Sequence, residues 1–224
     1  MNRPVMDRTT IAACAALALF ISVSASLSGE RLTYKGSDGT TGETTVSRTE
    51  TGYSIVSKAG AWDHEITTDS SFSTLQWMYH DAAEGTAITA TRSGDTIVVD
   101  GMFKGKKIQA TDRIDRDPWY QDWGIGLKSF VLGNDTTFSF WSINPNDVKQ
   151  MGKFDAKKEG EESLVVNDAA TETQRVRVAL QGFLSLFFSA DYWFRKSDGV
   201  LVQSRTPGAS GKPSLMLELV AREP

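Results

Sequence analysis

The sequence predicts a mainly β protein, in which a single antiparallel sheet curls into a half-barrel or barrel-like meander. Apolar and polar residues alternate with a period of two over most of the chain after residue 30, which is typical of strands with one buried face. Short turns separate these segments, and together they predict about a dozen strands. Consecutive hairpins without intervening helices argue against a βαβ arrangement. A sheet of that size must curl or close.

The first part of the chain predicts a meander of tight hairpins. Leu75, Trp77 and Tyr79 share one face of a predicted strand, because side chains alternate between the two faces. The Ser-Gly-Asp triplet at 93–95 is a turn of the kind that joins two strands directly. Strands are predicted around Leu32 and Tyr34 and at 43–49, 53–59, 74–80, 88–90, 97–99 and 107–112.

One or two short helices are expected, and residues 123–132 have the spacing of one. Leu127, Phe130 and Val131 fall on one side of this segment, and Gly133 follows as a stop signal. The helix is predicted although two glycines within it lower its helix propensity.

The sheet is predicted to resume after the helix. Val176 and Val178 face inward in one of its strands, and Arg175 and Arg177 face outward. Further strands are predicted at 138–143, 149–158, 161–166, 174–180, 192–195, 200–204 and 215–219.

Residues 1–25 have the order of a cleavable signal peptide. Arg3 and Arg8 precede an apolar stretch at 11–23, and small residues ending at Ala25 follow it. The stretch is shorter than the roughly 20 apolar residues of a membrane span. An uncleaved anchor and a cut a few residues later are the alternatives. We expect an exported periplasmic protein with one β-rich domain at 26–224 and no transmembrane helix after cleavage.

Cys14, the only cysteine, lies inside this leader. Residues 11–14 superficially resemble a lipoprotein cleavage box, but the apolar stretch follows the cysteine, whereas acylation requires it to precede. Outer-membrane tethering through Cys14 is therefore not expected. The mature chain has no thiol, which excludes thiol nucleophiles and cysteine metal sites.

The charge balance gives no sign of a nucleic-acid partner. Loss of the leader's Arg3, Arg8 and Asp7 changes the formal net charge from −4 to −5. No run of basic residues with interleaved aromatics occurs, so the chain lacks the electrostatic footprint of nucleic-acid binding.

The segment 190–202, with Tyr-Trp-Phe at 192–194 and an Asp-Gly turn at 198–199, resembles uncharacterised bacterial periplasmic β-rich domains. Those domains are similar to the lipoprotein-carrier (Lol-type) superfamily, whose antiparallel sheet forms a half-barrel around an acyl-chain cavity. The resemblance implies a hydrophobic ligand, such as a lipid or acyl chain, in the concavity of the sheet. The resemblance does not imply any catalytic motif.

Residue types that could carry chemistry do not form a recognisable pattern. His64 lies between two acids, but its neighbours in a strand point to the opposite face, so a solvated strand is favoured over a metal site. His80 is expected on a polar hairpin rim. The acids and arginines of 112–117 predict a salt-bridged, solvated loop. A hydrolase that uses these carboxylates with His80 is a further alternative, but we expect a non-enzyme without cofactor or metal.

Two apolar segments stand out, Trp119-Tyr120 with Trp123, and residues 182–188. Both are expected in the core, or else at the mouth of a cavity or at a membrane interface. The leading hypothesis is a hydrophobic cavity, and the alternative is an envelope scaffold with a filled core, no small-molecule ligand and a protein partner. The predicted cavity lining is Trp77, Tyr79, Phe138, Phe140, Trp141, Leu184, Phe187 and Trp193.

Overall fold

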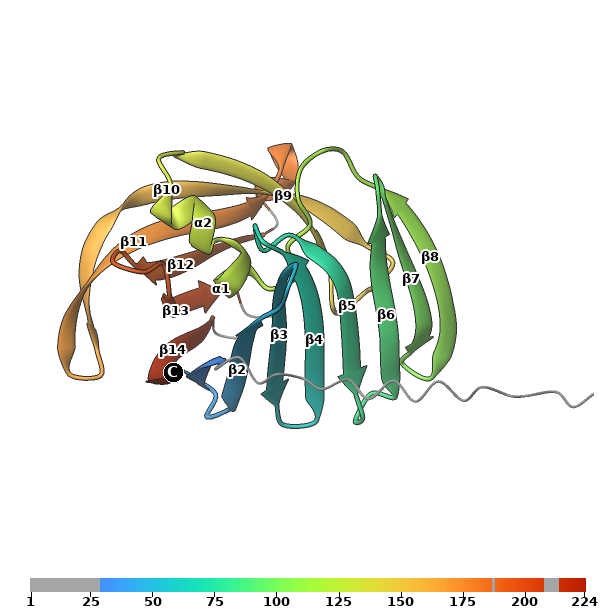
Figure 1. The fold of residues 1–224 in the computed structure, drawn as a ribbon, viewed down its shortest axis with the longest axis horizontal. Coiled ribbons are helices and arrows are strands. Elements are labelled where there is room, and N and C mark those ends of the chain that lie inside the picture. Colours follow the sequence, from blue (N-terminus) through green and yellow to red (C-terminus); the bar gives the residue numbers. More distant parts are fainter. Residues whose placement is uncertain (1–28, 187, 208–213) are drawn as a thin grey trace, which may run out of the picture.

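The computed structural model describes residues 29–186, 188–207 and 214–224. The predicted leader with Cys14, and the predicted lining residue Phe187, lie outside these ranges. The described residues form one antiparallel sheet of fourteen strands, with short helices between the eighth and ninth (Figure 1). The predicted mainly β fold with a single curled sheet is confirmed.

The first eight strands are a meander of uniform hairpins. Strands β2 to β8 each contain eight residues. Ile55, Ile66, Trp77, Ala90 and Val99 lie directly opposite one another across β3 to β7 and are buried. This inner row is the physical result of the period-two pattern. The bounds are β1 (Glu30–Gly36), β2 (Thr41–Arg48), β3 (Gly52–Ala59), β4 (Trp62–Asp69), β5 (Thr74–Asp81), β6 (Thr86–Ser93), β7 (Thr96–Phe103) and β8 (Lys106–Arg113).

The later strands vary in length. The predicted strands 149–158 and 161–166 are one strand, because a register shift between Lys158 and Gly160 absorbs the extra residue without ending the pairing. The bounds are β9 (Thr137–Ile143), β10 (Met151–Val166), β11 (Ala169–Leu180), β12 (Ser189–Arg195), β13 (Leu201–Thr206) and β14 (Leu215–Glu223).

The predicted helix is confirmed as two short consecutive helices, α1 (Trp123–Gly126) and α2 (Lys128–Leu132). A 3₁₀ helix, η1 (Gly182–Leu186), follows β11. Of the residues that the structure describes, no helix is long and apolar enough to cross a membrane.

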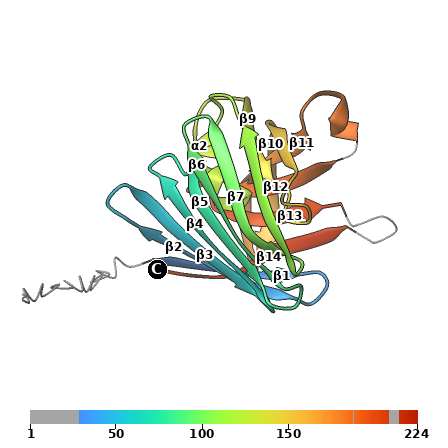
Figure 2. The same ribbon diagram turned by 90° about the vertical axis from the view of Figure 1, so that its right-hand side faces the viewer.

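The strand order places the two ends of the described chain together in the middle of the sheet. It runs β8-β7-β6-β5-β4-β3-β2-β1-β14-β13-β12-β11-β10-β9, so β1 pairs with β14. The outer strands β8 and β9 do not pair with each other in the described ladder, and the sheet is not closed. In Figure 2, β2 to β7 form one side of the curl and β10 to β13 the other.

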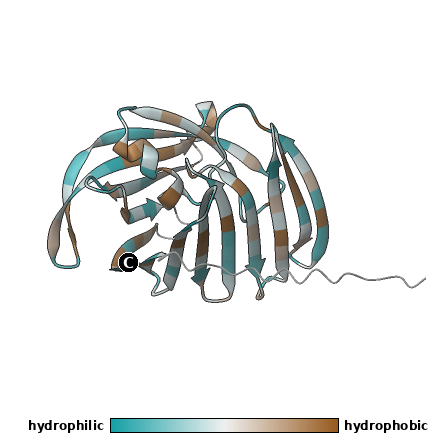
Figure 3. Cartoon of the chain, viewed as in Figure 1, coloured by the Kyte–Doolittle hydropathy of each residue, from teal (hydrophilic) through white to brown (hydrophobic). Residues whose placement is uncertain are grey.

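The buried apolar residues form two hydrophobic clusters, and hydrophobic and hydrophilic bands alternate along the strands (Figure 3). The first core is mainly aliphatic and centres on the inner row of β3 to β7. The second core is rich in aromatic residues from β9 to β12 and the helices. Its buried members are Tyr120, Leu127, Phe130, Val131, Phe140, Ala156, Val176, Val178, Ala190, Tyr192, Phe194 and Leu201.

An extended segment at 118–121, here called the strap, links the open edge β9 to the start of β5. The Tyr120 and Trp141 backbone amides donate to Trp141 and Pro118, at 2.9 and 2.8 Å. On the other side, the Thr74 amide donates to the Trp119 carbonyl at 2.7 Å. Trp119 lies in the first core and Tyr120 in the second, because consecutive side chains of an extended segment point in opposite directions.

Candidate functional site

The residues predicted to line a cavity are divided among the two cores and an exposed turn. Trp77 and Trp193 belong to the first core, and Phe140, which is fully buried, belongs to the second. Tyr79 and Trp141 pack against the first core and Phe138 against the second. Leu184 is 41% exposed on η1, and Phe187 lies outside the described residues. The seven described members of this set therefore do not form one wall.

A partly apolar depression lies elsewhere, where α1 and α2 meet the ends of the first strands. This groove has a volume of about 340 Å³. Its apolar members come from four places in the sequence, and charged residues stand beside them. The lining is Glu30, Val46, Arg48, Tyr53, Phe72, Ile125, Lys128, Ser129 and Leu132.

An aromatic pair on the sheet side of the groove is held by a strained turn. Phe72, between β4 and β5, has a φ of 65°, which a bulky residue rarely adopts. Its ring stacks on Tyr53, with 4.3 Å between the centroids. The Asp69 carboxylate accepts hydrogen bonds from the Ser71 and Ser73 amides, at 2.8 and 3.0 Å, and thereby fixes the turn. Strain maintained by its surroundings is typical of binding sites.

The other side of the groove depends on a tight packing of α1 against the strap. Asp122 caps α1, since its carboxylate accepts a hydrogen bond from the Ile125 amide at 3.0 Å. A Cβ on Gly126 would lie 2.7 Å from the Tyr120 ring, so only glycine allows this approach. The groove therefore has a fixed aromatic side and a fixed helical side.

The charges at the groove are not balanced. Glu30 forms an ion pair with Arg222. Neither Arg48 nor Lys128 forms an ion pair with any residue within 29–186, 188–207 and 214–224. The groove therefore carries local positive charge on a chain that is negative overall.

A polar depression of about 440 Å³ lies on the other side of the β4–β5 turn. Its two arginines come from β6 and from the segment before the strap. Arg92 donates to the Gly94 carbonyl at 3.1 Å and to the Ser73 hydroxyl at 3.4 Å. The lining is Asp69, Ser71, Ser73, Leu75, Arg92, Gly94, Arg116 and Pro118.

His64 faces the interior, so the expectation of a solvated side chain is wrong for this residue. Its side chain is only 16% exposed, and Nε2 lies 4.0 Å from a carboxylate oxygen of Asp122. Burial lowers the pKa of His64, while the nearby Asp122 opposes this shift. The sequence shows only the neighbours of His64 along its strand, and Asp122 comes close to His64 only through the fold. His80, in contrast, is exposed and pairs with Asp63 at 3.3 Å, as expected for a polar rim.

Within the described ranges, no serine or threonine hydroxyl is hydrogen-bonded to His64. Ser57 lies opposite His64 in the β3–β4 ladder, but its hydroxyl is 2.9 Å from the Thr44 hydroxyl. The negative charge of Asp122 also acts on two buried tyrosines, Tyr34 and Tyr192. The pKa of Tyr34 and of Tyr192 is raised, first by burial and then by the Asp122 charge.

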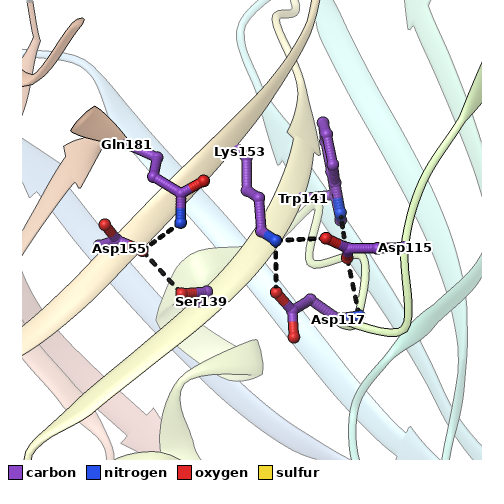
Figure 4. Close-up of polar contacts among 7 residues, drawn as sticks. All are labelled: Asp115, Asp117, Ser139, Trp141, Lys153, Asp155 and Gln181. Atoms are coloured by element: carbon purple, nitrogen blue, oxygen red, sulfur yellow. Dashed lines mark hydrogen bonds and ion pairs between the residues drawn. The ribbon is translucent and has the colours of Figure 1, made fainter. Parts of the chain in front are cut away.

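Residues 112 and 113 end β8, and the loop that follows them is salt-bridged as predicted, with a partner from β10. Lys153 binds Asp115 and lies 2.7 Å from Asp117, and the Trp141 indole donates to Asp115 at 2.8 Å (Figure 4). The hydrogen bond from Lys153 lowers the pKa of Asp115 to about 2. These carboxylates therefore anchor the segment before the strap, while His80 pairs with Asp63. The carboxylates of 112–117 and His80 therefore have different partners and do not form the common site that the hydrolase alternative requires.

The expectation that 182–188 is core is wrong for its first part. Phe183 is 77% exposed and Leu186 is 87% exposed on η1, whereas Phe188 packs against the second core. The chain leaves β11 here through a 3₁₀ turn that carries the side chains away from the sheet.

Among the described residues, no group of three or more His, Cys, Asp or Glu side chains is placed to hold a metal ion.

Comparison with solved structures shows a likeness of fold. A β-barrel-like protein of a domain of unknown function, DUF1849, from Brucella abortus is 10% identical, with a TM-score of 0.55. The alignment covers 88% of this chain and 98% of that chain. The hypothetical lipoprotein YmcC from Escherichia coli aligns at a TM-score of 0.36 and 9% identity, over 89% of this chain and 87% of that chain. No family model and no curated protein matches the sequence. The Lol-type resemblance stays a prediction.

Proposed function

We propose that this chain is an exported cell-envelope protein that binds an apolar small molecule in the groove between α1–α2 and the ends of β1, β2 and β3. The observation that carries the proposal is the Tyr53–Phe72 pair, which a strained turn holds at the groove. Export is supported by the leader pattern of residues 1–25. The proposed site therefore lies at the rim of the sheet, whereas the sequence predicted one in its concavity.

The groove has the properties that apolar binding requires. Its volume lies at the lower end of small-molecule sites, which span about 300–1,000 Å³. Leu132 is 50% exposed there, so apolar surface remains for a ligand to cover. Covering it contributes about 25 cal/mol per Å² removed from water.

A neutral fluorescent probe, N-phenyl-1-naphthylamine, tests the proposal on the purified mature protein. We expect saturable binding that Leu132→Ser weakens, because this leucine lines the groove. Leu186→Ser is the matched control, since Leu186 is exposed on η1, away from the groove lining. Absence of saturable binding, or equal weakening by both variants, would contradict the proposal.

A second candidate, an envelope scaffold with a protein partner, is favoured by the exposed apolar side chains of η1. Exposed apolar patches mark interaction surfaces. A photo-crosslinking amino acid at Phe183 in the native envelope should capture one defined protein. The same amino acid at Val98, which is 37% exposed on β7, is the control and should capture none.

A further inference from the structure

We infer that the groove binds a single-chain amphiphile with an anionic head group, and that Arg48 and Lys128 bind this head group. The inference rests on the proposed function and names the ligand class of the same site. It combines two observations, an apolar groove of limited volume and two cations beside it.

The cations come from opposite sides of the groove. Arg48 ends β2 and Lys128 begins α2, and both line the depression. The stem of Lys128 is packed against the β12–β13 turn, since a Cβ on Gly199 would lie 2.9 Å from Lys128 Cγ. Lys128 is half-buried and Arg48 is exposed, and both remain accessible at the same depression.

The remaining charge at the groove does not cancel these cations. Glu30 is bound by Arg222, which also contacts Asp198. Neither cation has an ion-pair partner among the residues with described positions. A bound anion could therefore accept hydrogen bonds from both without breaking an existing ion pair. Charge-assisted hydrogen bonds to such donors are stronger than neutral ones.

The apolar part of the lining suits one chain. Val46, Tyr53, Phe72, Ile125 and Leu132 provide its aromatic and aliphatic contacts. The volume of about 340 Å³ is close to the lower limit of small-molecule sites, which favours a single acyl chain over a two-chain lipid. Each buried methylene should then improve affinity by up to about fourfold until the groove is full.

Calorimetric titration with three ligands of the same chain length tests the inference. Laurate carries a carboxylate, dodecyl phosphate carries a phosphate, and monolaurin is neutral. We expect at least one anion to bind about tenfold more tightly than monolaurin, and added salt to weaken only the anions. The stronger anion identifies the head group as a carboxylate or a phosphate, and either result supports the inference.

The double variant Arg48→Gln with Lys128→Gln should remove the preference for the anion, so that laurate, dodecyl phosphate and monolaurin bind with similar affinity. The matched control is Lys107→Gln with Arg113→Gln, two exposed cations of β8 outside the groove. If monolaurin binds as tightly as both anions, or if the control variant loses the preference equally, the inference is wrong and the proposed function stands. If none of the three ligands binds, the proposed function is wrong as well.

Discussion

The two parts of the sheet differ in the lengths of their strands and in the side chains that fill their cores. Strands β2 to β8 have equal length and join through tight turns, and their inner row is mainly aliphatic. Strands β9 to β14 range from six to sixteen residues, and they enclose an aromatic core with the helices. Regular hairpins therefore need only alternation of apolar and polar residues, whereas the irregular part needs large rings and inserted helices to fill its space.

The parts are joined at several places in the described chain, and the first core contains residues of both. Strands β1 and β14 pair in the middle of the sheet, the strap bridges β9 and β5, and α1 approaches His64 of β4 through Asp122. Because Trp119 and Tyr120 enter different cores, the strap couples the two cores physically. We therefore expect the parts to unfold together.

The largest effect is expected from truncating each core. Phe140→Ala should lower the free energy of unfolding by about 3–5 kcal/mol and Ile66→Ala by about 2–5 kcal/mol, since both side chains are fully buried. Urea denaturation measures the loss, and native-state hydrogen exchange locates it. Either variant should reduce protection in both β3–β5 and β9–β12. Loss of protection confined to the mutated part would show that the cores are independent.

A glycine in each part tests how closely each is packed. A Cβ on Gly52 would lie 2.0 Å from the Thr68 carbonyl oxygen, whereas a Cβ on Gly160 would meet nothing within 4 Å. Gly52→Ala should therefore cost about 1–3 kcal/mol of unfolding free energy. Gly160→Ala should change it by less than about 0.5 kcal/mol. Equal thermal shifts for the two variants would show that the regular part is no tighter than the bulged strand.

The His64–Asp122 contact predicts a pH dependence of the junction between β4 and α1. Burial lowers the pKa of His64 below its ordinary value of about 6.5. As the pH falls below about 6.5, the unfolded chain binds a proton at His64 before the folded protein does. The stability contributed by neutral His64 is therefore complete above about pH 6.5 and is lost as the pH falls toward the lower pKa of the folded protein. His64→Gln should flatten this part of a plot of melting temperature against pH. His80→Gln is the control and should retain the dependence, because His80 lies exposed on the polar rim.

The smallest effect is expected where Lys153 anchors the segment before the strap. Lys153→Gln should cause a slight loss of stability, since Asp115 and Asp117 are partly exposed. The depressed pKa of Asp115 contributes stability above the ordinary carboxyl pKa of about 3.9. That contribution is lost as the pH falls toward about 2. Melting curves of the two proteins should therefore converge in acid, and a constant difference would contradict this role.

The sequence predicted most of the strands and the helical segment correctly, because alternation and turn residues are local signals. It predicted the inward direction of Val176 and Val178 and the salt-bridged loop at 112–117. It missed that β10 is continuous, since a bulge that absorbs one residue cannot be distinguished from a chain break by pattern alone. It also placed the apolar turn at 183–186 in the core, because hydrophobicity does not show whether a neighbour covers the side chain.

By itself, the sequence determined the leader pattern, the absence of cysteine from 26–224 and the alternation that makes a curled antiparallel sheet. Only the tertiary structure decided that β1 pairs with β14 and that the strap divides its side chains between two cores. It also decided which residues share the groove. Tyr53, Phe72 and Leu132 are far apart in the chain, and contacts of that kind depend on how the whole sheet curls, which no local pattern encodes.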